Sequence, residues 1–363
     1  MLERLGIKLL WFDSLGAKSA SVYMETSIGG MVIDPGAAAM QPSYPLPDTE
    51  KKKLREKAIK RIESACKKAK VIVITHYHYD HHLPPSTREL RNPYDMYLNG
   101  KSLILKNPNA YINESQWKRS RIFLNEILSL IRENLESYMT TPQFTDFPDP
   151  VEELQYAMKR DFGSYTTRRS ELLRRGRDWF RKLVEKYWSN KPWIKDNITL
   201  KDGTKIIWGN GKRIELGDTI IQVLRPWFHG IEYDRTGWVT PLLIVKRNYR
   251  VFYTSDLMGP QIEDYAYTIV DIKPDILIAD GPPTYLFPYM LNRVNLNRAI
   301  ENMKYIIKEA QPKLIIYDHH LLREKRWRER VKAVFELAVR EGVKVVTAAE
   351  YLGFKPLIDT LYF

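Results

Sequence analysis

Four of the chain's seven histidines lie within residues 71–85, which read VIVITHYHYDHHLPP. The motif His76-x-His78-x-Asp80-His81 directly follows a run of β-branched apolar residues that predicts a strand. Side chains two positions apart on extended backbone point to the same side, so His76 and His78 can share one metal ion. Asp80 and His81 follow where the chain turns, and they can hold a second ion. Imidazole and carboxylate ligands suit Zn²⁺ and other divalent cations.

The remaining histidines also follow apolar, strand-like runs. His229 stands in RPWFHG, and the pair His319 and His320 stands in LIIYDHHLL. A further carboxylate, Asp256, ends the run VFYTSD. All seven histidines therefore lie at the ends of predicted strands, which indicates one composite metal centre. A surface run of histidines, the alternative, would need neither a preceding strand nor partners elsewhere in the chain.

The elements that must position these residues read as an interrupted α/β fold. Strand-like runs and a helix near residues 50–69 precede the first histidines, and strand-like runs resume at residue 199. Between them, SQWKRSRIFLNEILSLIRENLESY and RRSELLRRGRDWFRKLVEKYW have helical spacing. We therefore expect an N-terminal half of the fold in residues 1–85, a mostly helical insertion in residues 86–198, and a C-terminal half in residues 199–363.

The order of the candidate metal ligands resembles the metallo-β-lactamase superfamily. Asp34 in VIDPG is similar to the first motif of that superfamily, and the clustered histidines with Asp80 are similar to the second. His229, Asp256 and His319 are similar to the third, fourth and fifth motifs. We favour His319 over the adjacent histidine for the fifth motif because LIIYDH ends its strand. The stretches SLGAKSASVYMET, THYHYDHHLPP, IADGPPTY and DHHLLR resemble an uncharacterised archaeal family of predicted metal-dependent hydrolases within the superfamily.

The resemblance implies a four-layer αβ/βα sandwich with two divalent ions at one edge of the paired sheets. Zinc is the metal that we expect there. The resemblance also implies two ligand sets joined by one shared carboxylate: His76, His78 and His229 for the first ion, Asp80, His81 and His319 for the second, and Asp256 for both. A metal-bridging hydroxide would attack a carbonyl carbon or a phosphorus atom. Asp34 would support the loop that carries the ligands.

Four residues have candidate roles beyond this assignment of metal ligands. His82 and His320 could protonate a leaving group or orient a neighbour, and a structural role is an equal alternative for both. Asp80 is a candidate for catalysis as well as for metal binding. Asp280 in DGPPTY could support a ligand or contact substrate, or it could cap the turn into the next helix.

The insertion contains a basic segment. Residues 159–182 hold nine Lys or Arg against three Asp or Glu, with four aromatic residues between them. Basic and aromatic side chains together suit phosphate backbones and stacked bases, whereas a solvated basic face over an aromatic core is the alternative. The candidate substrate-binding residues in this segment are Arg168, Arg169, Arg174 and Arg175.

Composition limits the choice of function. The net charge is +13, the single cysteine fits a reducing cytoplasm, and no apolar stretch approaches the ~20 residues of a membrane span. Three functions remain: a two-metal phosphodiesterase with an anionic substrate such as RNA or DNA, a hydrolase of a small ester, lactone or thioester, and a non-catalytic nucleic-acid-binding relative. The complete ligand set disfavours the third. The sequence carries no signal for an oligomeric state.

Overall fold

The computed structural model describes residues 1–361 and contains two seven-stranded mixed sheets. The first sheet contains, in spatial order, β1 (Ile7–Phe12), β2 (Ala20–Thr26), β3 (Gly29–Ile33), β4 (Ala69–Ile74), β5 (Ser102–Leu105), β9 (Lys205–Trp208) and β8 (Ile198–Thr199). The second contains β10 (Arg213–Leu216), β11 (Thr219–Val223), β14 (Leu242–Lys246), β15 (Tyr249–Tyr253), β16 (Ile276–Asp280), β17 (Leu314–Asp318) and β18 (Lys344–Val346). Strands β3, β4, β5 and β9 run parallel, as do β15 to β18, and the other pairs are antiparallel.

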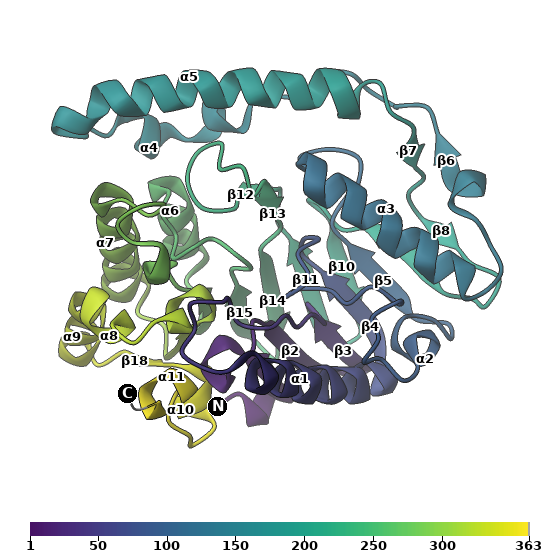
Figure 1. Cartoon of the computed structure of the whole chain (residues 1–363), viewed down its shortest axis with the longest axis horizontal. Helices are drawn as coiled ribbons and strands as arrows, with labels where there is room; N and C mark the ends of the chain where they lie inside the picture. The colour runs from purple at the N-terminus through teal and green to yellow at the C-terminus, as the bar shows by residue number, and fades with distance from the viewer. Residues whose placement is uncertain (362–363) are drawn as a thin grey trace.

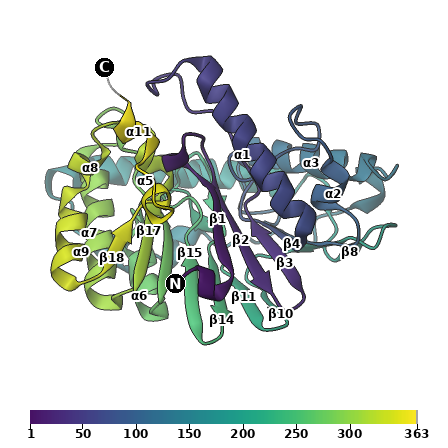
Figure 2. The ribbon, with the colours of Figure 1, turned by 90° about the horizontal axis from the view of Figure 1, so that it is seen from below.

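Helices cover the outer faces of the sheets. Beside the first sheet lie α1 (Asp48–Lys68), α2 (Pro93–Tyr97) and α3 (Glu114–Ser129). Beside the second lie α6 (Glu263–Ile272), α7 (Arg293–Ala310), α8 (Trp327–Arg330) and α9 (Lys332–Glu341), followed by α10 (Ala348–Tyr351) and α11 (Leu357–Thr360). Figure 2 shows the strands between these two groups of helices. This arrangement confirms the expected αβ/βα sandwich. No helix of residues 1–361 is both long enough and apolar enough to cross a membrane.

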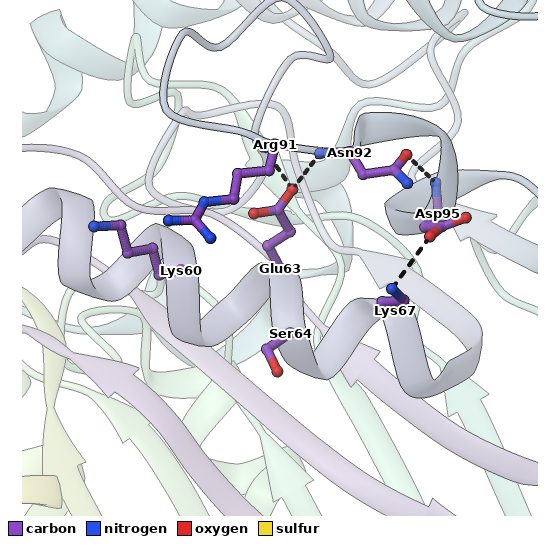
Figure 3. Close-up of a pocket in the computed structure, with 7 residues that line it drawn as sticks. All are labelled: Lys60, Glu63, Ser64, Lys67, Arg91, Asn92 and Asp95. Atoms are coloured by element: carbon purple, nitrogen blue, oxygen red, sulfur yellow. Dashed lines mark hydrogen bonds and ion pairs between the residues drawn. The ribbon is translucent and has the colours of Figure 1, made fainter.

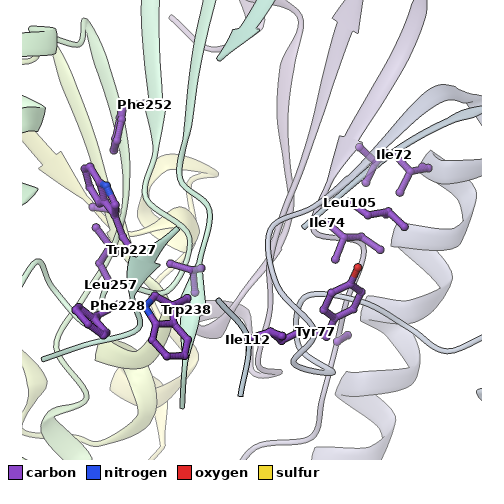
Figure 4. Close-up of a cluster of buried hydrophobic side chains, with 14 of the residues drawn as sticks. Ile72, Ile74, Tyr77, Leu105, Ile112, Trp227, Phe228, Trp238, Phe252 and Leu257 are labelled. Carbon is purple, nitrogen blue, oxygen red and sulfur yellow. The ribbon is translucent and has the colours of Figure 1, made fainter. Parts of the chain in front are cut away.

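Both faces of the central strands are apolar because both are covered. Along β4, Val71 and Val73 belong to the core between the two sheets, whereas Ile72 and Ile74 belong to the core beneath the helices. Successive side chains on a strand point to opposite faces, so a buried parallel strand must be apolar throughout. Figure 4 shows the helix-side cluster, in which Trp238 lies between the residues of the two halves.

Strand β5 lies inside the expected insertion, residues 86–198, but it is a member of the first sheet. It pairs parallel with β4 on one side and with β9 on the other. The boundaries of the insertion remain a prediction, and β5 within this range belongs to the first sheet of the sandwich. The segment between β5 and β9 holds α3, α4 (Gln155–Lys159), α5 (Thr166–Leu183), a π-helical turn η6 (Val184–Trp188) and the two-residue strands β6 (Met139–Thr140) and β7 (Trp193–Ile194).

Helix α5 lies across one end of the sandwich, at the top of Figure 1. Its Trp179 stacks on Trp238 of β13 (Trp238–Val239) with ring centroids 5.4 Å apart. A Cβ on Gly176 would stand closer than 3.0 Å to the side chain of Tyr233, so only glycine allows this approach. Helix α5 is therefore packed on the segment that follows His229.

Candidate metal centre

The clustered histidines lie in a loop that begins where β4 ends, and Asp34 fixes this loop. Asp34 is fully buried and follows β3 with a φ of 48°. Its Oδ1 accepts the Thr75 backbone N–H at 2.8 Å, and its Oδ2 accepts the Thr75 hydroxyl at 2.7 Å. Oδ2 also lies 2.8 Å from Nδ1 of His81. Asp34 therefore has the supporting position that its motif implies, since it orients the loop and one imidazole together.

Gly36 allows the same loop to approach β3 closely. A Cβ at this position would stand closer than 3.0 Å to backbone atoms of Asp80, His81 and His82. Backbone atoms cannot move aside as a flexible side chain can. The Asp34-Pro35-Gly36 turn and the histidine loop therefore form one packed unit.

Asp256 lies at the centre of the histidines and is only 1% exposed. Its Oδ1 is 2.8 Å from Nε2 of His81 and 3.3 Å from Nε2 of His319. Its Oδ2 is 3.4 Å from Nε2 of His76 and 3.3 Å from Nε2 of His229. Each carboxylate oxygen thus faces a different pair of imidazoles.

The seven candidate ligands form two groups around this carboxylate. Potential ligand atoms lie within 4.8 Å of one another in His76, His78, His229 and Asp256, and again in Asp80, His81 and His319. His78 and Asp80 are less buried than the other members. The structure therefore brings together all seven residues, with the more accessible side at His78 and Asp80.

Several polar atoms of these groups are buried without a hydrogen-bond partner in the described part of the chain. They are Nε2 of His76, both ring nitrogens of His229 and both carboxylate oxygens of Asp256. Leaving a buried polar atom unpaired costs about 1–3 kcal/mol. Convergent imidazole nitrogens around a buried carboxylate are the donor set of a divalent cation. The residues therefore fit a metal centre.

Protonation differs between the two groups. Burial opposes the charged form of His81, but Asp256 and Asp34 raise its pKa to about 10. Burial likewise opposes the charged form of His319, whose pKa is nevertheless raised well above its ordinary value by Asp13 and Asp256. By contrast, burial and His229 lower the pKa of His78 to about 3. Without metal, His81 and His319 therefore hold protons near neutral pH, whereas His78 is neutral.

The adjacent histidines of the fifth motif both face Asp256. Strand β17 ends at Asp318, and His319 begins a 3-10 turn, η8 (His319–Arg323), with a φ of 36°. Because both histidines lie beyond the end of β17, the alternation of side chains along a strand does not apply to their rings. Nε2 of His319 lies 3.3 Å from an oxygen of Asp256, and Nε2 of His320 lies 3.9 Å from the other oxygen. His319 and His320 form a potential metal-binding group together with Asp256, and His319 alone of the two is also grouped with Asp80.

His320 and Asp280 form a buried pair beside Asp256. Nδ1 of His320 lies 2.9 Å from Oδ1 of Asp280, whose Oδ2 accepts the Met258 backbone N–H at 2.7 Å. Burial and the negative charge of Asp256 raise the pKa of Asp280 well above its ordinary value. Asp280 thus holds His320 in place, as expected of a supporting residue.

Two supporting residues were not predicted from the sequence. Asp13 is buried, and its Oδ1 lies 2.8 Å from Nδ1 of His319 while its Oδ2 accepts Nε of Arg323 at 2.5 Å. Nη2 of Arg323 lies 3.5 Å from Asp80 Oδ2. The sequence contains a signal for each of these two residues. Asp13 ends the apolar run KLLWFD, and Arg323 is the last residue of the stretch DHHLLR.

His82 does not face the cluster. Its Nδ1 lies 2.9 Å from the carbonyl oxygen of His78, and its ring packs edge-on against Phe123 and Tyr77. The structure thus separates His82 from the candidate ligands, because the turn after His81 directs its side chain into the core beneath α3. This position favours a structural role for His82 over a role in proton transfer.

The four candidate arginines of the insertion do not share one face. Arg169 is buried, and its Nη2 donates to Glu232 at 2.8 Å, so it is not free to contact substrate. Glu232 also receives two hydrogen bonds from the buried Arg298. The other three arginines are exposed on α5, where Arg168 and Arg175 pair with Glu171.

One surface cavity, of about 300 Å³, lies between α1 and α2 (Figure 3). Several of its polar groups pair with one another, since Glu63 accepts the backbone N–H groups of Arg91 and Asn92, and Lys67 pairs with Asp95. None of its lining residues belongs to the histidine groups. This cavity therefore has no part in the metal centre.

The chain resembles several known proteins in fold and in sequence. No family model matches it. Among solved structures, it is similar to the metallo-beta-lactamase fold protein YhfI from Bacillus subtilis, with TM-score 0.40 and 12% identity over 91% of this chain and 88% of that one. It is also similar to a diphosphatase from the PhnP family, with TM-score 0.36 and 13% identity over 90% and 81%.

Relatives by sequence come from archaea. The UPF0282 protein of Methanopyrus kandleri is 28% identical over 95% of this chain and 92% of the relative. The UPF0282 protein of Sulfurisphaera tokodaii is 31% identical over 349 residues, which cover 96% of this chain and 88% of the relative. With 31% identity over 96% of its length, the chain belongs to the UPF0282 protein family.

Proposed function

We propose that the protein is a hydrolase that uses two divalent metal ions, one on each side of Asp256. The observation that supports this proposal is the Asp256 carboxylate, whose two oxygens face two different pairs of histidines and lack hydrogen bonds among the described residues. A buried carboxylate in this position can neutralise two cations at once. The sandwich fold and the cluster of histidines and aspartates fit a metal-dependent hydrolase.

Two bound divalent cations would supply an activated water molecule and would neutralise negative charge in the transition state. The chain itself supplies orientation. Asp34 and Asp13 face the Nδ1 atoms of His81 and His319, which leaves each Nε2 directed at Asp256. An imidazole held in this way presents the correct tautomer to a cation.

The proposed role of His320 is proton transfer at the reacting centre as a neutral imidazole, because burial and the neighbouring Arg323 and His319 lower its pKa well below its ordinary value. Asp280 holds its Nδ1, and its Nε2 points towards Asp256 at 3.9 Å. A positioned imidazole of this kind can transfer a proton at the reacting centre. Asp80 takes a metal-binding role in this proposal because it is grouped with His81 and His319.

The proposed substrate is anionic and contains a phosphodiester. Nucleic acid is the largest substrate of this kind. The net charge of +13 supports an anionic substrate, as do the exposed arginines Arg168, Arg174 and Arg175 of α5. Positive charge attracts anions and raises their local concentration at the site.

The test is elemental analysis of the full chain after mild loading with Zn²⁺, with hydrolysis assays on a phosphodiester, a thioester and a lactone. We expect about two ions per chain. Asp256→Asn should lower the affinity of both sites by more than the roughly 10–100-fold loss typical of a supporting residue. Asp178→Asn, an exposed carboxylate on α5, is the matched control and should change neither quantity. A folded wild-type protein that repeatedly takes up no metal would overturn the proposal.

A further inference from the structure

Two surface cavities, of about 540 Å³ and about 210 Å³, lie where β5 and β9 end. Asn107, Phe144 and Asn210 line both of them, so the two cavities form one groove, which we call the Asn107 groove. None of its lining residues belongs to the histidine groups. Cavities of this size are typical of sites that bind small molecules.

The Asn107 groove lies on the same sheet edge as the metal centre. Strands β4, β5 and β9 are parallel, and their last residues are in register. The next backbone N–H groups of β5 and β9 still donate to the last carbonyl oxygens of β4 and β5, at 2.8 and 2.7 Å. His76, Asn107 and Asn210 each come two positions after the end of their strand. Because neighbouring strands lie about 4.8 Å apart, the two asparagines follow strands that are one and two spacings from the start of the histidine loop.

The side-chain amides of the two asparagines are held in place with their nitrogen atoms unpaired. Oδ1 of Asn210 accepts the Asn107 backbone N–H, and Oδ1 of Asn107 accepts the Asn109 backbone N–H, at 2.8 Å each. Since a backbone N–H can only donate, these contacts fix which end of each amide is the oxygen. Neither amide nitrogen has a hydrogen-bond partner within residues 1–361, and both side chains are half-buried. The groove therefore offers N–H donors to acceptor atoms of a ligand.

Phe144 adds an aromatic ring to these donors. The residue is 49% exposed, although two other rings support it. Its ring packs edge-on against Trp193 of β7, with centroids 4.8 Å apart, and lies 5.2 Å from the ring of Phe147. A half-exposed ring that is supported in this way can stack on a planar group of a ligand.

The opposite wall of the groove leads to the third ligand motif. Arg225 and Pro226 line the larger cavity and directly precede β12 (Trp227–Phe228), which ends one residue before His229. The exposed Arg225 pairs with the exposed Glu153 at 3.4 Å. Exposed ion pairs contribute little free energy, so Arg225 can exchange this partner for a phosphate oxygen.

We propose that the Asn107 groove binds a nucleobase of the substrate, next to the phosphodiester at the metal centre. The proposal rests on the proposed hydrolase function and deepens it by assigning a nucleotide as the substrate. Each amide oxygen already accepts a backbone N–H, so the groove offers donors rather than acceptors. Guanine presents two neighbouring acceptors, N7 and O6, whereas adenine presents an acceptor beside a donor. The groove should therefore prefer guanine to adenine.

Calorimetric titration of the zinc-loaded full chain with guanosine 5′-monophosphate (GMP), adenosine 5′-monophosphate (AMP) and ribose 5-phosphate tests the groove. The three probes carry the same phosphate and differ in the base, so a ratio of two affinities isolates the contribution of the base. GMP should bind at least about fivefold more tightly than ribose 5-phosphate, the lower end of the effect of stacking one base. It should bind about fivefold more tightly than AMP because of the two additional hydrogen bonds.

Variants of the groove should change these ratios without changing the zinc content. Phe144→Ala should reduce the ratio of GMP to ribose 5-phosphate affinity at least about fivefold, and Phe144→Trp should retain it. Asn107→Asp keeps an oxygen for the Asn109 N–H but removes the donors, so it should reduce the preference for GMP over AMP at least about threefold. The matched controls are Phe354→Ala, at an exposed ring beyond α10, and Asn248→Asp, in the exposed turn between β14 and β15. Both should bind all three probes like wild type.

The outcomes separate the two proposals. If the wild type takes up zinc but binds GMP no more tightly than ribose 5-phosphate, or if Phe144→Ala binds like Phe354→Ala, the groove is not a base site and the metal centre stands. If the wild type takes up no zinc, the hydrolase proposal fails, and the same titrations of the metal-free chain decide the groove. A base-dependent affinity that Phe144→Ala loses then supports it, and equal binding of the three probes overturns it. Equal affinities for GMP and AMP would overturn the role of the two amides.

Discussion

His319 and His320 are chemically identical neighbours, but different carboxylates hold them. Asp13 faces Nδ1 of His319, and Asp280 faces Nδ1 of His320. Because only His319 is grouped with Asp80 and His81, we expect His319→Ala to reduce the zinc content to about one ion. His320→Ala should keep both ions and slow turnover. Elemental analysis of the two variants checks this, and loss of an ion from His320→Ala would reverse the assignment.

Metal uptake should depend on pH because protons compete for the same nitrogen atoms. Asp256 and Asp34 raise the folded-state pKa of His81 to about 10 against burial, so the metal-free protein binds a proton there at neutral pH. In the metal-free protein, the stability from this protonated pair is fully present below the unfolded-state pKa. It is lost as the pH rises through the folded-state pKa of about 10.

A metal ion must displace this proton, so zinc affinity should rise with pH, about tenfold per pH unit for each proton released. Calorimetry at pH 7 in buffers of different protonation enthalpy should detect release of about one to two protons. Asp34→Asn should reduce the number released, because it removes one of the two carboxylates that stabilise protonated His81. Zinc binding without proton release would contradict the assigned protonation.

At the residue scale, the ends of apolar runs predicted the candidate ligands but not every supporting residue, since Asp13 also ends such a run. The seven candidate ligands follow such runs, and the structure brings them together. Asp13 and Arg323 could not be paired from sequence, because their contact joins positions 310 residues apart. The relation between His319 and His320 was also beyond sequence patterning, since it depends on the residue at which β17 ends and on a positive φ.

Two glycines allow close approach at different places, and their substitution should separate the metal centre from the insertion. A Cβ on Gly36 would collide with the backbone of the histidine loop, whereas a Cβ on Gly176 would collide with the Tyr233 side chain. We expect Gly36→Ala to lower zinc affinity at least about tenfold, because the loop must shift. Gly176→Ala should keep the zinc and increase amide exchange in α5. Equal zinc affinity in Gly36→Ala and wild type would show that the loop tolerates the shift.

Sequence patterning recognised the long elements and missed a short one. Helical spacing predicted α3 and α5, and apolar runs predicted the central strands of both sheets. Strand β5 has only four residues, and a short apolar run does not distinguish a strand from a buried helical segment. Arg169 was grouped with exposed arginines because its partner, Glu232, is 63 positions away. Local charge density cannot reveal such a distant buried contact.

For the whole molecule, the exposed basic face of α5 allows a test of nucleic-acid binding. We expect a variant with Arg168, Arg174 and Arg175 changed to Glu to remain folded, since Arg169 keeps its buried contact with Glu232. Its affinity for single-stranded RNA or DNA should fall, and each lost phosphate contact should reduce the slope of log affinity against log salt by roughly 0.7. Hydrolysis of a minimal aryl phosphodiester should be unaffected.

Binding assays at several salt concentrations measure this slope, and an exposed-lysine variant, Lys52→Glu, is the control on a distant helix. Unchanged slopes in the triple variant would exclude α5 as a nucleic-acid surface. Faster cleavage of lactones or thioesters than of phosphodiesters by the wild type would favour a small-molecule substrate instead.

The apolar face between the two sheets also has a consequence for the protein while it is being made. The inner residues of the first sheet, such as Val71 and Val73, pack on strands that come after the insertion in the chain. A ribosome adding about 5–20 residues per second needs roughly 7–30 s for the roughly 150 residues between His81 and His229. During that interval the first half has neither its opposite sheet nor a complete ligand set. We therefore expect the nascent chain to be prone to aggregation until its second half emerges, and the complete set of candidate ligands to assemble only late in its maturation.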